Sequence, residues 1–430
     1  MKKNNPQWNV TGVDSLGRPV YSKVSQSKDI PQVSQGVHID PGAQSVVNVL
    51  HQHGLKPMLV GGCVRDSILG LESKDVDIEV YGAQSMEEVS QIMSTVARVD
   101  PVGQSFGVLK VMSQGEDIDV SLPRRDSLAD GGNTHRSINA EVDPTMTIEE
   151  ASTRRDFTIN AIAYNPITNS YVDPHGGMDD LEDGILRLVD EGTFGDDPLR
   201  VLRGVQFAGR FDMEMDEDTI EVCSSMTHEG LAKERIAGEF HKLLLKSTNL
   251  HRGIDTLHQV GWDRAVPSID CTREPIDQDV VNKIYGHNPT VTMGLVAALV
   301  DYHYGSGNGD VAKEMMLTGP ERRVFNDFPL DRGGDQIYMS RMIRSGNHHG
   351  VSSDVVRSMV STQVSPAPDL WSGNSPEPYQ VTGKTLIDMG LKPGPEFKRI
   401  LSTCQDINDS GRMIDSETLR GVVNGSVESS

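Results

Sequence analysis

Two aspartates stand one residue apart in KDVDIEVYG, residues 74–82. This stretch alternates polar and apolar residues as a strand does, which places Asp75 and Asp77 on one face. Two carboxylates so close repel each other unless a cation neutralises them, and their hard oxygen ligands suit magnesium shared with substrate phosphates. The alternative is a solvated strand face that merely carries alternating acids.

A later strand, EDIDVSL at residues 116–122, carries two more aspartates. Asp119 could add a third carboxylate to the pair, although Asp117 competes for that role. The sequence alone leaves the choice between them open.

A glycine pair precedes the first two aspartates in VGGCVRDSILG, residues 60–70. Gly61 and Gly62 follow a predicted strand and precede a predicted helix, where free amides and the helix dipole can hold phosphate oxygens. Because many strand-to-helix turns need glycine for structural reasons alone, that alternative stays open.

Two further stretches carry paired polar side chains. Arg154 and Arg155 precede an apolar run in which Asn160 could fix a sugar hydroxyl, and the arginines could contact phosphate and ribose. In DDPLRVLR, residues 196–203, a proline at the first helical position puts Asp197 and Arg200 on one side of a helix. Without a nucleotide nearby, these would be a salt-bridged helix start and a helix-cap ion pair.

The elements that position these residues follow from hydrophobic periodicity. Residues 1–37 are polar and lack periodicity, so we expect a flexible extension. The next zone alternates helix and strand signals, including a helix at AQSVVNVLHQHG, a buried strand at KPMLVGG and a hairpin of FGVLKVMS with EDIDVSL. From about residue 185 helices dominate, and beyond about residue 265 we expect short helices joined by loops.

Composition limits the function classes. The 430 residues carry a formal charge of −22, which argues against a generally basic nucleic-acid binder. Local charge differs from the total, because residues 231–252 hold five basic residues against Glu234 and Glu239. An acidic protein can therefore still carry a basic face, for which the candidates are Lys233, Arg235, Lys242 and Lys246.

The compartment is expected to be the cytoplasm. No apolar run approaches the roughly 18 to 20 residues of a membrane span, and the N-terminal lysines have no apolar segment after them. Four scattered cysteines fit neither a zinc spacing nor a disulfide framework.

In combination, these stretches resemble the class II tRNA nucleotidyltransferase and bacterial poly(A) polymerase family. The matching pieces, in family order, are LVGGCVRDSILG, KDVDIEVYG, RRDFTINAIAYNP, DPHGGMDDLEDGILR, DDPLRVLRGVQFAGRF and ERIAGEF. The resemblance implies an α+β fold, in which a polymerase-beta-like nucleotidyltransferase head is followed by all-helical neck, body and tail domains. The corresponding ranges are 1–37 for the extension, 38–180 for the head, 181–250 for the neck, 251–365 for the body and 366–430 for the tail.

The implied activity is template-independent addition or repair of the 3'-terminal CCA of tRNA from CTP and ATP. Asp75 and Asp77 would hold two magnesium ions, with Asp119 as the third catalytic carboxylate, while the RNA 3'-hydroxyl displaces pyrophosphate. The nucleotide-binding set would be Gly61, Gly62, Arg65, Asp66, Arg154, Arg155, Asp156, Asn160, Asp197, Arg200 and Arg203.

Hydrogen bonding gives a rule for base choice. A carboxylate acceptor at Asp197 beside a guanidinium donor at Arg200 complements the amino group and ring nitrogen of C and of A. U and G present the reverse pattern and would leave buried polar groups unpaired. The pair predicts selection of C and A but does not decide their order.

The expected partner is the tRNA acceptor arm, recognised by shape and backbone through the basic face. Residues 124–152 match the position of a flexible loop in CCA-adding members, and their glycines suit a lever for switching specificity. Two departures stand out: Gln206 replaces an arginine common in the neck helix, and LVAALVDYHY lacks the His-Asp pair of a phosphohydrolase domain.

Alternatives remain within and outside the family. A poly(A) polymerase, or a specialist that adds only CC or only A, would share most of these motifs. A small-molecule nucleotidyltransferase would share the head but need no long helical platform, and an inactive RNA-binding relative would be expected to lose a metal-binding aspartate.

Overall fold

The computed structural model describes residues 8–13, 19–23, 36–73, 75–100, 107–128, 138–273, 275–306, 310–328, 336–361, 381–409, 414 and 416–425. The chain divides into two compact units. The first comprises Met1–Ala208 and Asp212–Leu231, and the second comprises Gly209–Phe211 and Ala232–Ser430. Among the described residues, no helix is long and apolar enough to cross a membrane.

The first unit is built on a seven-stranded sheet. The strands, in spatial order, are β11 (Ser170–Val172), β10 (Ala163–Asn165), β3 (Lys56–Val60), β4 (Val76–Tyr81), β7 (Glu116–Ser121), β6 (Val108–Ser113) and β5 (Arg98–Asp100). Neighbouring strands pair antiparallel except β4 and β7, which run parallel. The predicted strands at KPMLV and VDIEVY are confirmed, as is the hairpin β6–β7.

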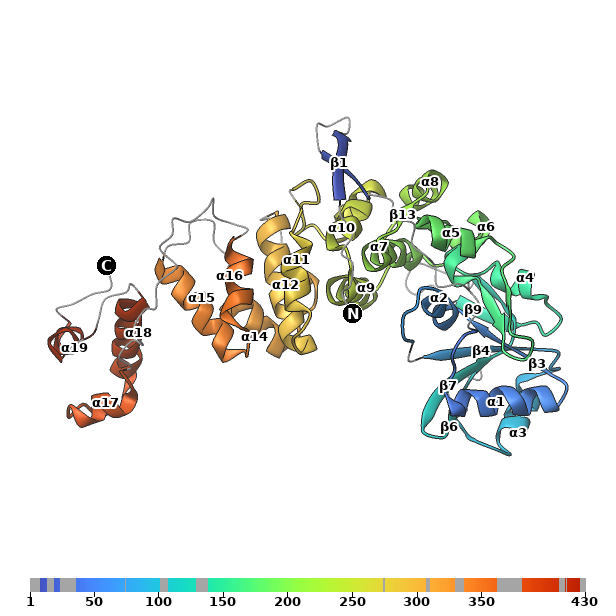
Figure 1. Ribbon diagram of the computed structural model, residues 1–430, viewed down its shortest axis with the longest axis horizontal. Coiled ribbons are helices and arrows are strands. Elements are labelled where there is room, and N and C mark those ends of the chain that lie inside the picture. The colour runs from blue at the N-terminus through green and yellow to red at the C-terminus, as the bar shows by residue number, and fades with distance from the viewer. Residues whose placement is uncertain are drawn as a thin grey trace. The chain divides into compact units, whose positions relative to one another are not determined.

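Helices cover both faces of this sheet. On one face α1 (Pro41–Gln52) packs against α3 (Met86–Met93) and the strands beside them, as Figure 1 shows. The other face buries a cluster that includes Met58 and Val60 of β3, with Ala151 of α4 (Ile148–Ser152). Asp77 shares this second face, because it pairs directly with Val60.

Local chemistry explains the two turns nearest the site. The β6–β7 hairpin turns through Gln114 and Gly115, whose φ angles of 52° and 88° are those of a type I′ turn. Gly61, with φ 76°, precedes the short helix α2 (Gly62–Ile68), and a positive φ favours glycine over residues with a Cβ.

The rest of the first unit consists of short elements. These are β1 (Trp8–Val13), β2 (Pro19–Lys23), β8 (Arg124–Leu128), β9 (Ile138–Val142), η2 (Thr158–Asn160), α5 (Gly177–Asp183), β12 (Ile185–Leu186), α6 (Glu191–Phe194), β13 (Glu214–Met215) and α8 (Glu217–Ser225). The N-terminal extension expected at residues 1–37 thus includes the antiparallel pair β1–β2. The glycine-rich part of the predicted lever loop lies outside the described residues.

Helix α7 (Leu199–Phe211) belongs to both units, and the described part of the second unit is otherwise mainly helical. Its helices are α9 (Lys233–Lys246), α10 (Leu250–Gln259), η3 (Asp263–Ala265), α11 (Gln278–Ile284), α12 (Pro289–Tyr304), α13 (Val311–Glu314), α14 (Gly319–Asp327), α15 (Gln336–His348), α16 (Ser353–Ser361), α17 (Gly383–Asp388), α18 (Pro395–Asp409) and α19 (Ser416–Val423). The expectation of only short helices beyond residue 265 is wrong for α12. That helix is apolar and buried almost all round, so it has no amphipathic periodicity to detect.

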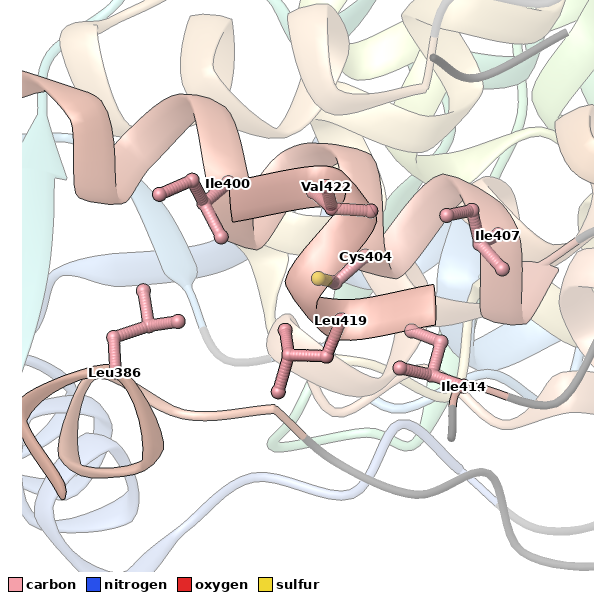
Figure 2. Packing of buried hydrophobic residues seen from close by; sticks show 7 residues of the cluster. All are labelled: Leu386, Ile400, Cys404, Ile407, Ile414, Leu419 and Val422. Carbon is pink, nitrogen blue, oxygen red and sulfur yellow. The ribbon is translucent and has the colours of Figure 1, made fainter. Parts of the chain in front are cut away.

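The last three helices share a core of their own. Figure 2 shows its buried side chains, which come from α17, α18, α19 and the segment before α19. They are Leu386, Ile400, Cys404, Ile407, Ile414, Leu419 and Val422.

Candidate active site

The carboxylates predicted to bind metal lie side by side on the sheet. Asp77 on β4 pairs in register with Asp119 on β7, which in turn faces Lys110 on β6. Directly paired residues point to the same face of a sheet. Asp77, Asp119 and Lys110 therefore form a row across three strands.

A second row lies one step toward the strand starts. Val76 pairs with Ile118, and Asp75 and Asp117 are the residues directly before them. Strand alternation puts both aspartates on the face of Asp77. The structure thus places four carboxylates on or directly before two neighbouring strands, and it is Asp119 that pairs with Asp77.

Lys110 supplies a positive charge at this array. Its Nζ lies 3.1 Å from Oδ1 of Asp119, and both side chains are substantially exposed. The hydrogen bond with Asp119 raises the pKa of Lys110. As an exposed ion pair it adds little stability, but it partly neutralises the row.

The surroundings of Asp77 disfavour its charged form. Asp77 is exposed, yet the protein atoms around its carboxyl group displace enough water that desolvation is the largest influence raising its pKa. The guanidinium of Arg155 opposes this shift, whereas the charges of Asp119 and Asp75 add to it. The site therefore holds carboxylate repulsion that a cation would relieve.

The carboxylates of this array can supply part of a magnesium coordination shell. Within the described ranges, no three His, Cys, Asp or Glu side chains are grouped closely enough to enclose a metal ion by themselves. Magnesium is commonly held by one or two carboxylates, with water and substrate phosphate completing its octahedron. Asp75 and Asp77 supply such a partial set.

The Gly61 turn opens onto the same carboxylates. A Cβ at Gly61 would lie 3.2 Å from Nη1 of Arg155 and 3.5 Å from Oδ2 of Asp77. A Cβ at Gly62 would lie 3.6 Å from Nη2 of Arg65. Gly61, Arg155 and Asp77 thus converge, although they are far apart in the sequence.

Glu79 is a site residue that we did not single out from the sequence. It is 2% exposed, and its Oε2 accepts a hydrogen bond from Nη2 of Arg154 at 3.0 Å, with Nη2 of Arg155 at 4.0 Å. Burial alone would raise the pKa of Glu79, but Arg155, Arg154 and the hydroxyl of Tyr81 together hold it below its ordinary range. The period-two alternation that pairs Asp75 with Asp77 continues to Glu79 and could have identified it.

Five other predicted nucleotide-binding residues form one buried network. Nε of Arg65 donates to Asp66 at 2.8 Å, and its Nη1 donates to Oδ1 of Asn160. The amide of Asn160 donates to Asp156 at 2.8 Å, and Nε of Arg203 donates to Asp156 at 2.6 Å.

Phe207 of α7 lies within cation–π distance of both arginines of this network. The guanidinium carbons of Arg65 and Arg203 lie 5.2 Å and 5.3 Å from its ring centroid. Burial opposes ionisation of Asp156, but Arg203 and the hydrogen bond from Asn160 overcome it and lower the pKa of Asp156. The network fixes helix α7 to the segment that carries Asp156.

The proposed base-reading pair stands at the start of α7. Oδ1 of Asp197 accepts from the amide of Leu199 at 3.1 Å, as a capping residue does. The guanidinium of Arg200 donates to the carbonyls of Thr193 at 2.7 Å and Arg154 at 2.6 Å. The sequence predicts Pro198 to be the first helical residue. The helix begins one residue later, at Leu199, and Pro198 is its N-cap.

The predicted RNA-binding residues all belong to α9 in the second unit and are exposed. Lys242 and Lys246 follow Arg235 by seven and eleven residues, which is about two and three helical turns. The three side chains therefore share one side of the helix. Lys233 lies on a different side. Nζ of Lys242 also pairs with Glu239 at 2.8 Å.

Comparison with known proteins places these residues in a family. Residues 58–187 match the poly A polymerase head domain. A protein named multifunctional CCA protein from Xylella fastidiosa strain M23 is 31% identical over 255 residues, covering 57% of each chain. A protein of the same name from Neisseria meningitidis is 36% identical over 211 residues, covering 48% of each. The chain thus spans about half the length of these curated relatives.

Solved structures support the fold over a longer range. The Thermotoga maritima CCA-adding enzyme complexed with tRNA superposes with a TM-score of 0.60 at 20% identity, covering 91% of this chain and 98% of that one. The Bacillus stearothermophilus CCA-adding enzyme in complex with CTP gives a TM-score of 0.56 at 21% identity, covering 91% and 95%.

The matched segment contains every carboxylate and arginine of the site on the sheet, including Asp77, Asp119 and Arg155. The resemblance drawn from the motifs is confirmed for this part of the molecule. Residues 58–187, which include the carboxylates of the candidate active site, therefore match the poly A polymerase head domain, and the chain is also similar to the multifunctional CCA proteins.

Proposed function

We propose that the chain is a template-independent RNA nucleotidyltransferase that adds or repairs the 3'-terminal CCA of tRNA from CTP and ATP. The observation that carries this proposal is the convergence of Asp77, Arg155 and the Gly61 turn inside a poly A polymerase head domain. A triphosphate needs amide and guanidinium donors, and the attacking hydroxyl needs nearby carboxylate-bound cations. The convergence offers both.

In this proposal Asp75 and Asp77 hold magnesium, with Asp119 beside them. Bound magnesium would lower the pKa of the RNA 3'-hydroxyl and neutralise charge as pyrophosphate departs. The chain's own donors orient the reactants: the Gly61 turn and Arg155 lie where they can direct the triphosphate so that the hydroxyl attacks the α-phosphate in line. Lys110 limits the repulsion that Asp119 adds to the array.

Base selection by Asp197 and Arg200 is compatible with their contacts. A carboxylate has lone-pair sites for several donors, and a guanidinium has five N–H donors. The bonds to Leu199, Thr193 and Arg154 hold the two side chains at the start of α7. An amino group beside a ring nitrogen acceptor, as in C and A, complements the two side chains.

The proposed partner is the tRNA acceptor arm, contacted by the basic side of α9, and the proposed compartment is the cytoplasm. The solved Thermotoga maritima relative is complexed with tRNA, and another CCA-adding enzyme, with a TM-score of 0.60, is complexed with ATP. The described cysteines are free and buried, which suits a reducing compartment.

The test is single-nucleotide incorporation by the purified protein. The substrates are tRNAs that end at the discriminator base, at C or at CC, each incubated in magnesium with one labelled nucleoside triphosphate. We expect C on the first two substrates, A on the third, and neither U nor G. Absence of incorporation from every triphosphate would refute the proposed function.

A poly(A) polymerase is the second candidate, because the matched head domain carries that description. It would share the carboxylates and the chemistry but extend unstructured oligonucleotides with repeated A. Equal use of such primers and tRNA would favour this candidate. Addition of only C or only A would indicate a specialist of the same family.

A further inference from the structure

Glu79 is a buried carboxylate of β4 that the proposed chemistry does not use. It follows Asp77 on the same face of β4, and both of its carboxylate oxygens are engaged, Oε1 by the hydroxyl of Tyr81 and Oε2 by Arg154. We propose that Glu79 is a positioning residue that holds the triphosphate-binding and base-reading parts of the site in register. This inference rests on the proposed function.

The first part of the argument concerns Arg155. Arg154 and Arg155 are neighbours in the chain, and their guanidinium groups would repel each other. Both groups nevertheless lie against the carboxylate of Glu79. The shared carboxylate holds them together while Nη1 of Arg155 lies at the Gly61 turn. Without this anion, Arg155 would lose the contact that restrains its flexible side chain beside the triphosphate position.

The second part concerns Arg154, which links two structural elements. Its side chain donates to Glu79 on β4, while its main-chain carbonyl accepts from Nη2 of Arg200 on α7. Nη1 of Arg200 donates to the carbonyl of Thr193. The hydroxyl of Thr193 in turn donates to the carbonyl of Thr153, the residue before Arg154. Displacement of Arg154 would therefore move a carbonyl that orients the guanidinium of Arg200.

The two parts lead to a distinctive expectation. Loss of the negative charge at Glu79 should weaken triphosphate binding and base discrimination together, although both oxygens of Glu79 are engaged by protein groups. A residue that only stabilised the sheet would lower the melting temperature and change neither quantity in the folded protein.

The test is Glu79→Gln, which preserves the shape of the side chain and removes its charge. We expect KM for CTP and ATP to rise by about 10- to 100-fold, as is typical when a supporting partner of a site is lost. The ratio of C to U incorporation should fall in the same variant. Affinity for CTP, measured by calorimetry, should fall more than affinity for CMP, because the loss is at the triphosphate.

Glu116→Gln is the matched control. Glu116 is also an acid of the same sheet that supports other groups, since it accepts from the amides of Gly42 and Ala43 at the start of α1. This variant should melt earlier than the parent without a change in KM or in base preference.

The outcomes separate this inference from the proposed function. An active parent protein with an unchanged KM and C-to-U ratio in folded Glu79→Gln would overturn the role of Glu79 alone. Absence of activity and of CTP binding in the parent would overturn both. If Glu79→Gln does not fold, Tyr81→Phe removes one of the two bonds to Glu79 and should produce a smaller shift in the same direction, whereas no shift would refute the inference.

Discussion

Asp77 and Glu79 lie two residues apart on one face of β4, yet their surroundings act on them in opposite directions. Around Asp77, burial and the charges of Asp119 and Asp75 outweigh Arg155 and raise its pKa. Around Glu79, Arg155, Arg154 and Tyr81 outweigh burial and lower its pKa. One strand thus carries an acid whose charge the fold opposes and an acid whose charge the fold satisfies.

Asp156 belongs with Glu79 in this comparison. It is 6% exposed and accepts hydrogen bonds from Arg203, Asn160 and the amide of Phe157. Groups that are fully satisfied by the protein support structure, whereas a charge left to be neutralised marks the place where a ligand contributes. From this comparison we propose that Asp77 takes part in the chemistry, while Glu79 and Asp156 support the structure around it.

The largest expected effect is on catalysis by Asp77→Asn. Loss of one of two carboxylates proposed to hold magnesium should reduce C incorporation by roughly a thousandfold or more, corresponding to about 4 kcal/mol. Binding of tRNA, measured by filter retention, should remain close to that of the parent. Substantial turnover by this variant in magnesium would break the assignment of Asp77 to chemistry.

The second effect is on stability and concerns Asp156→Asn. Removal of the buried charge that holds Arg203 should lower the free energy of unfolding by about 3 kcal/mol, measured by urea denaturation near pH 7. Since the folded pKa of Asp156 is lowered, its charge stabilises the fold above the ordinary carboxyl pKa of about 4.

That contribution is lost as pH falls through the lowered folded pKa. The stability difference between the parent and Asp156→Asn should therefore shrink at acid pH. A difference that stayed constant down to the acid limit of the folded state would show that charge is not the cause.

Asp197→Ala sharpens the comparison, because Asp197 combines a capping bond with a proposed reading role. Loss of a buried charge-assisted contact to the base should cost about 1.5 to 3 kcal/mol, or roughly tenfold to more than a hundredfold in discrimination of C from U. Single-nucleotide incorporation by the folded variant measures this ratio. An unchanged ratio with an earlier melting transition would assign Asp197 to the helix cap alone.

The basic residues can also be divided into supporting and ligand-binding groups, since Arg154 is half-buried against Glu79 while Lys246 is exposed on α9. Lys246→Ala should weaken tRNA binding modestly and lower the slope of log K against log salt by about one phosphate contact. Base choice should not change. Lys233→Ala, on another side of the helix, is the matched variant and should alter the slope less.

The smallest expected effect is a rise in thermal stability in Asp77→Asn. Because the folded pKa of Asp77 is raised, the stability associated with its protonated form is present below the ordinary pKa and lost as pH rises through the folded pKa. At neutral pH in a chelator, the asparagine variant should melt slightly above the parent, and the two should converge in acid. A lower melting temperature at neutral pH would contradict the uncompensated charge.

Local patterns in the sequence predicted the parts of this site that are local in the chain. Alternation predicted the strand with Asp75 and Asp77, and the turn residues Gln114 and Gly115 lie between two predicted strands of a hairpin. The approach of Arg155 to Gly61 depends on pairing between distant segments and has no local pattern. The same holds for the bond from Arg200 to the carbonyl of Arg154, because these residues lie 46 positions apart in the chain.

The parallel pairing of β4 with β7 has a consequence for the order of folding. β6 and β7 can form a hairpin by themselves, whereas parallel neighbours require a long crossover, here the segment with α3, β5 and β6. Contacts between distant segments form slowly, because loop-closure entropy is lost before they are gained. Half of the carboxylates arrive with β4 and half with β7, so the array comes into existence only at this late docking step. Partly folded chains would then have Asp75 and Asp77 without Asp119 beside them.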